Sequence, residues 1–359
     1  MMKLTIDAAA LRDALGHSVA RTGVHELQHL ALLEATGVAP MGQVSLTTMD
    51  FVQQVTTRTE AQVEEGGELA VDPKLLKSAL LGLEGEVKIT QDETGLQVSQ
   101  GRCRSRIETV VGDPLKAFPL FDEEQAQPLP SMAAMWYAAI ERVAYAAAKS
   151  DVRHYLNAVF IGRQQAIALS GHRGASTPLP SVPDDIELLI PEATVQRLLK
   201  ALEGEKRVVL EVFRRGKDTP HALRMRSEGL DLTVKLVDGR YPNESTVIPK
   251  PKDVTAKATF SAPEARIAFE RAAALDAKGV RIQSGDGVLR IAGEHTDDLV
   301  ECAGGAQAFE VGINPAYVLD VIKAAGDDDV TWNFTAVDGR QLFTLGGREG
   351  EIHIIMPLR

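Results

Sequence analysis

Hydrophobic and polar residues follow two different periods along the chain. Apolar residues recur every three or four positions over 6–22, 131–149 and 261–275, as in IDAAALRDALGHSVART, and this spacing predicts amphipathic helices. Stretches such as GLQVSQGRCRSRIETVVGD and GVLRIAGEHTDDLVECAGG alternate over short distances and are broken by Gly and Asp. Those stretches are typical of antiparallel strands joined by turns. The sequence therefore predicts an α+β protein whose helices pack on antiparallel sheets.

A second helical pattern occurs three times, which indicates an internal repeat. Residues 69–90, 188–212 and 310–334 each read as an apolar strand, a Pro, an amphipathic helix, a Gly and another strand. Pro in the first turn and Gly just past the last turn are the usual ends of a helix. Each of these segments follows one of the three helices above, so the predicted unit has two helices and several strands.

The chain length suits this threefold division. It has 359 residues, enough for two or three domains of ordinary size. Two stretches rich in Pro and polar residues, EEQAQPLP near 127 and IPKPKD near 252, are typical of linkers. We therefore expect domains at 1–127, 128–251 and 252–359.

Composition narrows the class of protein. Hydrophobic residues make up 44% and charged residues 25% of the chain, which is ordinary for a globular protein. The sequence has no apolar run long enough for a membrane span and no secretion signal at its start. Its two cysteines, Cys103 and Cys302, lie far apart in unlike contexts. We expect a reduced, cytoplasmic protein without a membrane partner.

The net charge alone argues against a nucleic-acid partner. It is −11 at neutral pH, whereas nucleic-acid-binding domains usually carry a basic surface. The net charge does not show how the charges are distributed, however, and an acidic protein can still have one basic surface. The placement of the basic residues therefore matters more than the total.

One short motif suggests a metalloenzyme. Residues 25–29 read HELQH, and on a helix His25 and His29 could hold zinc while Glu26 acts as general base. The corresponding positions of the other two repeats, VRHYLNAVFIG and GVRIQSGDG, read as strands. In a strand, residues four apart are separated by about 13 Å, too far for two ligands of one zinc ion. We expect the motif to lead into a strand, and a zinc metallohydrolase remains the alternative.

Several longer motifs resemble one family. They are DVRHYLNAVF (151–160), SGHRG (170–174), KLVDGRYPNESTVIPK (235–250), NPAYVLDVIKA (314–324) and IHIIMPLR (352–359). In this order they resemble the bacterial DNA polymerase III beta subunit, the sliding clamp. RSRIETVVGDPLKAFPLFDEE (104–124) also resembles the end of that family's first domain. The resemblance covers nearly the whole chain.

The resemblance implies an architecture and a function. It implies three clamp domains per chain and a head-to-tail homodimer that closes into a ring, with helices lining a hole around duplex DNA. Such a ring is a processivity factor that binds DNA without sequence preference and tethers replicative and repair polymerases. It implies DNA polymerase and clamp-loader subunits as partners, bound through short apolar peptides. It implies no catalysis, no metal and no cofactor.

Three places depart from the family pattern. TGVHELQH (22–29) stands where the family usually has a basic loop and a strand, so Arg21 is the nearest basic candidate there. Leu169 and Ser170 stand in place of the usual Thr and Asp, and Gly174 in place of an apolar residue. These departures suggest a divergent clamp with an altered partner preference.

Basic residues occur on or next to all six predicted helices, and we expect them to face the DNA. Such contacts would be independent of sequence and sensitive to salt. The predicted lining residues are Arg12, Arg21, Lys74, Lys77, Arg142, Lys149, Arg153, Arg197, Lys200, Arg266, Arg271 and Lys323.

Opposite charges lie near the two ends of the chain. GRCRSRI (101–107) is a basic strand and GEHTDDLVE (293–301) an acidic one, which suits a head-to-tail contact that closes by rotation. The resemblance adds Ile107 and Leu275 as its apolar part. The predicted interface residues are Arg104, Arg106, Ile107, Leu275, Asp297, Asp298 and Glu301.

The resemblance also implies a pocket for partner peptides. Met and Pro make an adaptable apolar surface, which suits several partners. The predicted pocket residues are Leu156, Leu169, His172, Arg173, Pro242, Val247, Asn314, Tyr317, Ile354, Ile355, Met356, Pro357 and Leu358. A third possibility besides the clamp and the zinc enzyme is a clamp-like scaffold that does not encircle DNA.

Overall fold

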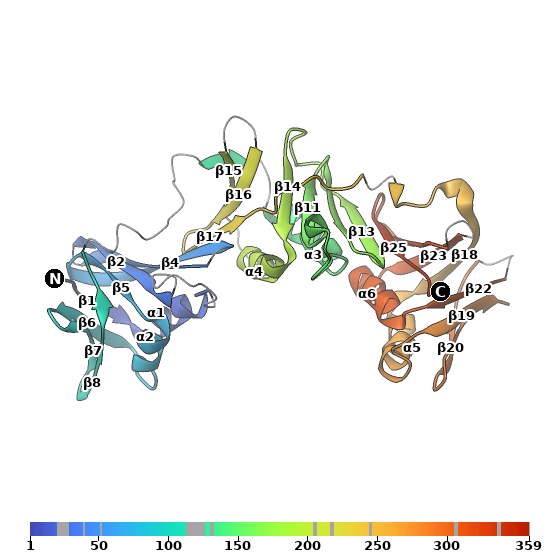
Figure 1. Cartoon of the computed structure of the whole chain (residues 1–359). Helices are drawn as coiled ribbons and strands as arrows, with labels where there is room; N and C mark the ends of the chain where they lie inside the picture. The colour runs from blue at the N-terminus through green and yellow to red at the C-terminus, as the bar shows by residue number, and fades with distance from the viewer. Residues whose placement is uncertain are drawn as a thin grey trace. The chain divides into compact units, whose positions relative to one another are not determined.

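The computed structural model describes most of the chain. Its described residues are all of 1–359 except 20–28, 39, 51, 113–125, 130–132, 204–206, 216–218, 244–245, 305–307, 336–338 and 359. Six α-helices and antiparallel strands make up this part of the chain, so the predicted α+β class is confirmed. All six predicted helices are present (Figure 1).

The elements repeat three times in one order: a strand, a helix, four strands, a helix and three strands. The first repeat is β1 (Lys3–Asp7), α1 (Ala8–Gly16), β2 (Ala31–Val38), β3 (Met41–Met49), β4 (Gln53–Glu65), β5 (Gly67–Val71), α2 (Pro73–Ala79), β6 (Glu86–Asp92), β7 (Gly95–Gln100) and β8 (Cys103–Ile107), followed by the short β9 (Thr109–Val110). The second is β10 (Ala126–Leu129), α3 (Ala133–Ala144), β11 (Ala158–Gly162), β12 (Gln165–Leu169), β13 (Arg173–Pro178), β14 (Glu187–Pro191), α4 (Glu192–Leu202), β15 (Val209–Arg215), β16 (Thr219–Arg226) and β17 (Leu230–Lys235). The third is β18 (Val254–Ser261), α5 (Ala262–Leu275), β19 (Val280–Gly285), β20 (Val288–Ala292), β21 (Asp297–Glu301), β22 (Phe309–Ile313), α6 (Pro315–Ala325), β23 (Asp329–Thr335), β24 (Gln341–Leu345) and β25 (Ile352–Ile355).

Side-chain caps fix the start of two helices. The Asp72 carboxylate accepts hydrogen bonds from the backbone N–H groups of Lys74 and Leu75 at 2.7 and 3.3 Å. Asn314 accepts one from the N–H of Ala316 at 2.9 Å. A proline follows each cap, where its missing N–H costs no helical hydrogen bond. Helices α2 and α6 therefore begin where the Pro pattern predicts.

The chain forms two compact units. The first comprises Met1–Leu129 and Lys200–Leu236. Its strands form one sheet in the order β10-β15-β16-β17-β4-β1-β6-β7-β8, to which β2, β3, β5 and β9 are joined. Helices α1 and α2 pack together beside these strands, and their residues Leu11 and Leu76 are fully buried in its core.

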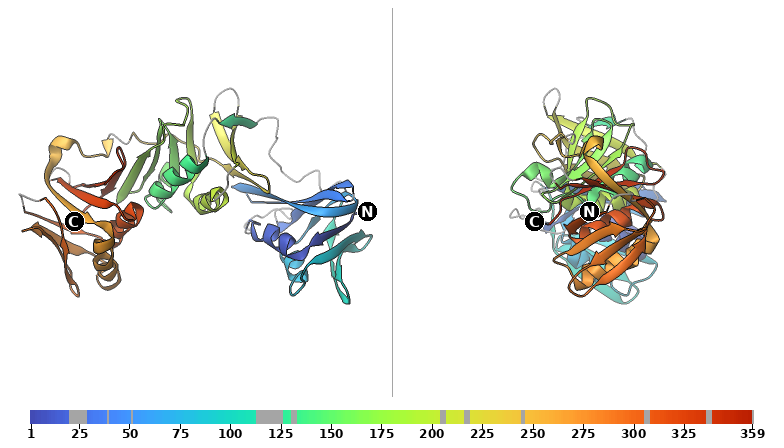
Figure 2. Two further views of the ribbon diagram at one scale, coloured as in Figure 1. Left: turned by 180° about the vertical axis from the view of Figure 1, so that it is seen from behind. Right: turned by 90° about the vertical axis from the view of Figure 1, so that its right-hand side faces the viewer.

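The second unit comprises Pro130–Leu199 and Val237–Arg359. It has an eight-stranded sheet, β14-β11-β12-β13-β25-β24-β23-β18, and a four-stranded sheet, β21-β20-β19-β22. Helices α5 and α6 pack side by side (Figure 2). Phe269, Trp332 and Phe343 are buried in the core of this region.

One stretch differs from the sequence prediction. VRHYLNAVFIG was expected to be a strand throughout, but His154–Leu156 is a 3-10 helix and β11 begins only at Ala158. The reason is a local pair of hydrogen bonds, because the Asn157 amide bonds both the N–H and the C=O of Asp151 at 2.8 and 2.9 Å. Such side-chain bonds to the backbone compete with strand pairing.

Of the HELQH motif, only His29 is among the described residues. Residues 25–28 lie outside the described residues, and His29 precedes β2, which begins at Ala31. The strand β2 thus begins two residues after the motif, and the expectation that the motif itself is extended stays a prediction.

Candidate peptide-binding and nucleic-acid-binding surfaces

The predicted peptide pocket gathers around the strand β25. This strand pairs with β13, with Ile355 opposite Arg173 and Ile354 opposite Gly174. Beyond the strand, the N–H of Met356 donates to the carbonyl of His172 at 2.7 Å. Backbone hydrogen bonds thus hold the predicted pocket residues of β25 directly beside those of β13.

Several predicted pocket residues belong to one apolar cluster. Leu156 and Leu169 are buried there with Tyr241, and the half-buried Val247 packs against them. The Arg340 guanidinium donates to the carbonyl of Val247 at 2.7 Å and so holds the segment that carries it. Arg340 belongs to no sequence motif, so sequence reasoning had no signal by which to find it.

The two residues that depart from the family pattern are cross-strand partners. Leu169 on β12 lies opposite Gly174 on β13. A Cβ atom placed on Gly174 would lie 2.6 Å from Cδ2 of Leu169. The Leu169 side chain therefore occupies the space that a larger residue at 174 would need, and the two departures are one packing change.

A stack of aromatic and cationic groups forms the polar side of the pocket. The Arg173 guanidinium lies 4.8 Å from the ring centre of Tyr317 and 5.6 Å from that of Tyr145, and it forms an ion pair with Asp320. The ring of His172 stacks on Tyr317 at 6.2 Å. Burial raises the pKa of Asp320, and the attraction of Arg173 only partly offsets this effect. Sequence reasoning missed Tyr145 and Asp320.

The remaining pocket residues lie at the surface or near it. His172 and Leu358 are exposed, whereas Pro242, Asn314, Met356 and Pro357 are half-buried. Ile354 and Ile355 are buried. The accessible part of the predicted pocket is therefore its polar side and the segment after β25.

Most predicted DNA-lining cations already have partners within the chain. Arg12 donates to the carbonyls of Leu80 and Leu83 at 2.9 and 2.6 Å. The other partnered cations form ion pairs: Arg142 with Glu351 (3.4 Å), Lys149 with Glu192 (4.0 Å), Arg153 with Asp151 (2.7 Å), Arg266 with Glu270 (2.9 Å) and Arg271 with Asp298. Arg197 is half-buried on α4, and Arg21 lies outside the described residues. Lys74, Lys77, Lys200 and Lys323 are exposed, and the described residues include no ion pair for them.

The predicted interface charges are also largely neutralised within the chain. Arg106 pairs with Asp92 at 2.5 Å, and Asp297 pairs with Arg290 at 2.6 Å. The Arg290 hydrogen bond holds the pKa of Asp297 below its usual range. Because Asp298 pairs with Arg271, only Arg104 and Glu301 are charged interface candidates without an ion pair among the described residues.

The predicted apolar interface residues differ in exposure. Ile107 is 4% exposed and belongs to the core of its own unit, whereas Leu275 is 55% exposed. Leu299, which was not predicted, is 65% exposed on β21 between Asp297 and Glu301. Because its neighbours in the sequence are acidic, hydrophobic spacing did not mark Leu299 as part of an apolar surface.

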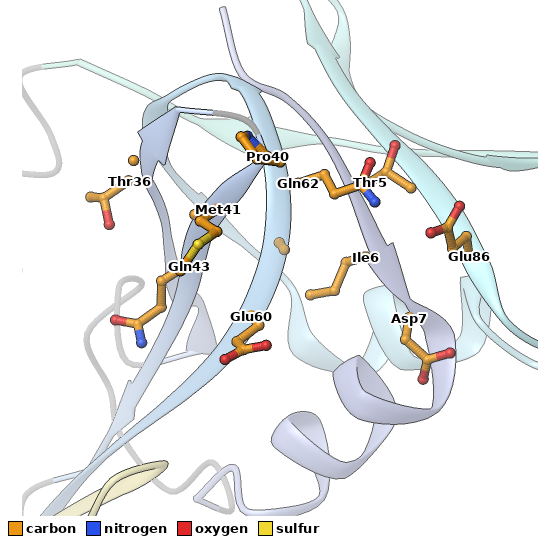
Figure 3. Close-up of a pocket in the computed structure, with 13 residues that line it drawn as sticks. Thr5, Ile6, Asp7, Thr36, Pro40, Met41, Gln43, Glu60, Gln62 and Glu86 are labelled. Atoms are coloured by element: carbon orange, nitrogen blue, oxygen red, sulfur yellow. The ribbon is translucent and has the colours of Figure 1, made fainter.

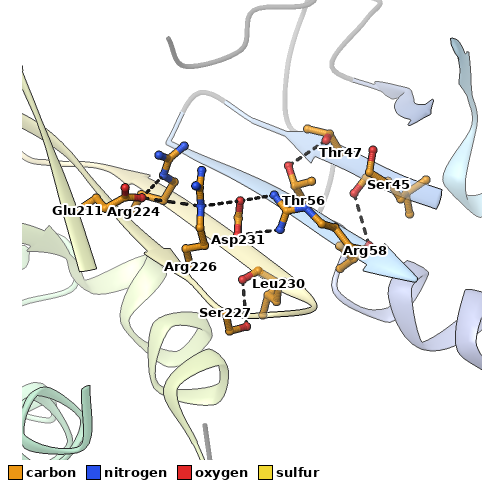
Figure 4. Close-up of polar contacts among 12 residues, drawn as sticks. Ser45, Thr47, Thr56, Arg58, Glu211, Arg224, Arg226, Ser227, Leu230 and Asp231 are labelled. Carbon is orange, nitrogen blue, oxygen red and sulfur yellow. Dashed lines mark hydrogen bonds and ion pairs between the residues drawn. The ribbon is translucent and has the colours of Figure 1, made fainter. Parts of the chain in front are cut away.

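Two pairs of strands from different repeats join the sheets. We call β4 with β17 the first seam and β13 with β25 the second seam. At the first seam, Arg58 makes two hydrogen bonds to Asp231, at 2.9 and 2.5 Å (Figure 4). Arg226 lies 3.4 Å from Asp231 and 3.9 Å from Glu211, and Glu211 accepts a hydrogen bond from Arg224 at 2.7 Å. Two carboxylates thus bind three guanidinium groups in this network, and the Arg58–Asp231 pair crosses the seam.

At the second seam, the carboxylate of Glu351 contacts four side chains. It accepts from Thr177 at 3.3 Å and pairs with Arg142 and Arg348, each at 3.4 Å. It also lies 3.2 Å from Nε2 of His353. Burial would raise the pKa of Glu351, but His353 and the two arginines together hold it below its usual range.

His353 lies fully buried between two partners. Its Nδ1 is 2.7 Å from the hydroxyl of Tyr145. Because an ionised carboxylate only accepts hydrogen bonds, Nε2 donates to Glu351, and Nδ1 of a neutral ring then accepts from Tyr145. The hydrogen-bond chain therefore runs from Tyr145, just after α3, through His353 of β25 to Glu351.

The first unit contains a hollow with carboxylates on its wall. It measures about 640 Å³ and lies among β1, β3, β4 and β6, with Asp7, Glu60 and Glu86 on its wall (Figure 3). Asp7 caps α1 by accepting from the N–H of Ala10 at 2.9 Å. The lining includes Thr5 and Thr36 but neither His, Cys nor Ser.

No group of three or more His, Cys, Asp or Glu side chains that could hold a metal ion occurs in the part of the chain that the structure describes. Among the same residues, no helix is long and apolar enough to span a membrane.

The repeated fold defines a class, and comparisons with known proteins show which proteins the chain is similar to. The fold is that of clamp structures: the DNA polymerase sliding clamp of Pseudomonas aeruginosa (TM-score 0.85, 24% identity, all of both chains) and the beta sliding clamp of Caulobacter crescentus (TM-score 0.87, 23% identity, 100% and 99% of the two chains). Residues 133–243 match the central domain of the DNA polymerase III beta subunit. The beta sliding clamp of Vibrio cholerae is 27% identical over 88% of this chain and 89% of its own, and that of Pseudomonas putida 26% over the whole of both. The chain is thus similar, over 88% to 100% of its length, to proteins named beta sliding clamp, and its central part matches the DNA polymerase III beta subunit.

Proposed function

We propose that this protein is a DNA sliding clamp, a non-catalytic ring that encircles duplex DNA and tethers polymerases to it. The observation that carries the proposal is the alignment of relatives named beta sliding clamp with 88% to 100% of the chain. The threefold repeat supports it, because three similar domains per chain, divided near 127 and 251, give a dimer six similar parts. A ring needs little local affinity for DNA, since topology retains it.

The proposed ring closes between two chains, head to tail. The exposed Leu275 and Leu299 supply apolar surface, and Arg104 and Glu301 supply the unpaired charges. An exposed ion pair contributes at most about 1 kcal/mol. Since Ile107 is buried in its own unit, the interface rests on few contacts, and we expect a dimer that opens readily.

The proposed partners are polymerase and clamp-loader subunits that carry short apolar peptides. The surface around Pro242, Val247 and Met356 would receive the peptide. Burying two or three large apolar side chains gains roughly 3–9 kcal/mol before the costs of association. Binding in the micromolar range follows and allows partners to exchange. Deletion of Met356–Arg359 should abolish peptide binding and leave the dimer intact.

The decisive experiment is retention on DNA of different topology. The protein is loaded on nicked circular DNA, and half of the sample is linearised before gel filtration at high salt. A clamp stays with circles and slides off linear molecules. Equal loss from both would refute encirclement and favour a scaffold. Negative-stain electron microscopy of the same preparation should show rings with a central hole, and compact particles would refute ring closure.

A further inference from the structure

The six helices differ in the charge that they leave available for DNA. Helix α2 carries Lys74 and Lys77 and no acidic residue, whereas each of the other five helices carries at least one Asp or Glu. Sequence alone places a cation on every helix, but it does not show which of these cations are neutralised by groups elsewhere in the chain. The difference lies in which cations are already neutralised.

Cations on the other helices are bound to groups of this chain. Arg266 and Arg271 on α5 pair with Glu270 and Asp298, and Arg142 on α3 pairs with Glu351. The pair must be broken before such a guanidinium can bind a phosphate, so the net gain from DNA is small. These cations add little to a salt-dependent interaction.

The lysines of α4 and α6 are exposed but lie close to acidic groups. Lys200 lines a hollow of about 650 Å³ together with Asp7, Asp13 and Glu60. Lys323 interacts electrostatically with Asp320, which lies one turn earlier on α6. Neighbouring carboxylates lower the positive potential around each of these lysines.

Helix α2 differs because its lysines have no ion pair among the described residues, and the carboxylate of its cap, Asp72, accepts hydrogen bonds from the backbone N–H groups of Lys74 and Leu75. Lys74 and Lys77 are three residues apart, so they lie on one face, and both are exposed. The buried Leu76 fixes the helix to the core of its unit. Arg12 donates to the carbonyls of Leu80 and Leu83 just beyond the helix, which adds a positive charge at its C-terminal end.

We infer that α2 makes the principal salt-dependent contact between this clamp and the DNA phosphates, through Lys74 and Lys77. The inference rests on the proposed function, because it assumes that duplex DNA passes through the ring. Each lysine–phosphate contact releases condensed counterions, so it increases the dependence of affinity on salt. The two lysines therefore set most of that dependence, and the paired arginines set little.

Two matched double variants test the inference. Lys74→Ala with Lys77→Ala removes two charges from α2, and Arg153→Ala with Arg266→Ala removes two cations that are paired with Asp151 and Glu270. Fluorescence anisotropy of a short labelled duplex is measured over a salt series. The slope of log affinity against log salt should fall by about two for each chain of the ring that contacts the duplex in the α2 variant, at roughly 0.9 per contact, and should stay unchanged for the other. An equal fall in both variants, or a larger fall in the second, would overturn the inference.

Two controls separate charge from folding and from the proposed function. Lys74→Arg with Lys77→Arg keeps both charges and should restore the slope, whereas a slope as low as that of the Ala variant would overturn the inference. Wild-type retention on circular and on linear DNA is measured with the same preparation. Loss of that topological difference refutes encirclement, while the slopes still report whether α2 contacts phosphates.

Discussion

The two seams have the same construction, but their neighbouring residues differ. Each joins antiparallel strands of different repeats, and each places carboxylates among arginines. The first seam contains Arg58, Asp231 and their neighbours, none of which belongs to a predicted binding surface. The second contains Arg142 from the predicted DNA lining, and its strand pair carries Arg173, Ile354 and Ile355 of the predicted pocket. The same kind of joint therefore lies apart from the predicted binding surfaces in one place and within them in the other.

This difference predicts how damage to each seam should spread. A substitution at the first seam should lower only the free energy of unfolding, because none of the residues in its ion-pair network belongs to a predicted binding surface. A defect at the second should lower both stability and peptide affinity, because the network and the pocket share the strand β25. Variants that remove one carboxylate from each seam test the distinction.

The largest expected effect is that of Asp231→Ala at the first seam. The Asp231 side chain is only 7% exposed, and its loss leaves Arg58 and Arg226 without their shared partner. Removing one member of a buried ion pair costs about 3–5 kcal/mol. Chemical denaturation should show this loss, while peptide affinity stays unchanged. Asp327→Ala, at an exposed Asp, is the matched control, and a fall in peptide affinity for Asp231→Ala would erase the contrast between the seams.

The next effect is that of Glu351→Gln at the second seam. This side chain is 1% exposed, and the amide cannot neutralise Arg142 and Arg348. We expect a loss of about 3 kcal/mol together with weaker peptide binding in isothermal calorimetry. Glu349→Gln, at an exposed position, is the control. Normal peptide affinity in a destabilised Glu351→Gln protein would show that β25 holds the pocket independently of the network.

The pH dependence separates two carboxylates near the second seam. The pKa of Glu351 is lowered, so its contribution to stability is full above its unfolded value and disappears as pH falls through the folded value. The pKa of Asp320 is raised, so its contribution is full at low pH and disappears as pH rises through the folded value. Denaturation between pH 3 and 7 should show the deficit of Glu351→Gln growing with pH and that of Asp320→Asn shrinking. Parallel curves for the two variants would contradict these assignments.

The smallest effect is that of Tyr145→Phe. It removes only the hydrogen bond to Nδ1 of His353, which is worth about 1 kcal/mol, and leaves the ring against Arg173. Tyr317→Phe is the control, because the described contacts of Tyr317 are made by its ring. Thermal denaturation should distinguish the two, and equal losses would mean that the Tyr145 hydroxyl contributes nothing to the seam.

The sequence predicted those features that depend on neighbouring residues. Hydrophobic spacing and Pro placement located all six helices, and the repeat located the three sets of strands. The 3-10 helix at His154–Leu156 escaped because it depends on a side-chain bond between Asp151 and Asn157 that periodicity does not register.

The sequence named candidate residues for each site, but it did not show which of their charges are paired within the chain. The structure places the predicted pocket residues of β13 and β25 side by side, and their role in peptide binding stays a prediction. The partners of the charged residues were not predictable, since Arg58 and Asp231 are 173 positions apart and Arg142 and Glu351 are 209 apart. Sequence gives the sign of each charge, and only the folded chain shows which charges remain available.

The position of β25 has a consequence for biosynthesis. It lies between β13 and β24 in the eight-stranded sheet, yet it is translated after every other strand of that sheet. Until it emerges from the ribosome, β13 and β24 each keep an unpaired edge, and such edges invite aggregation. A nascent or prematurely terminated chain that lacks this strand is therefore expected to depend on chaperones and to be an early substrate for proteases.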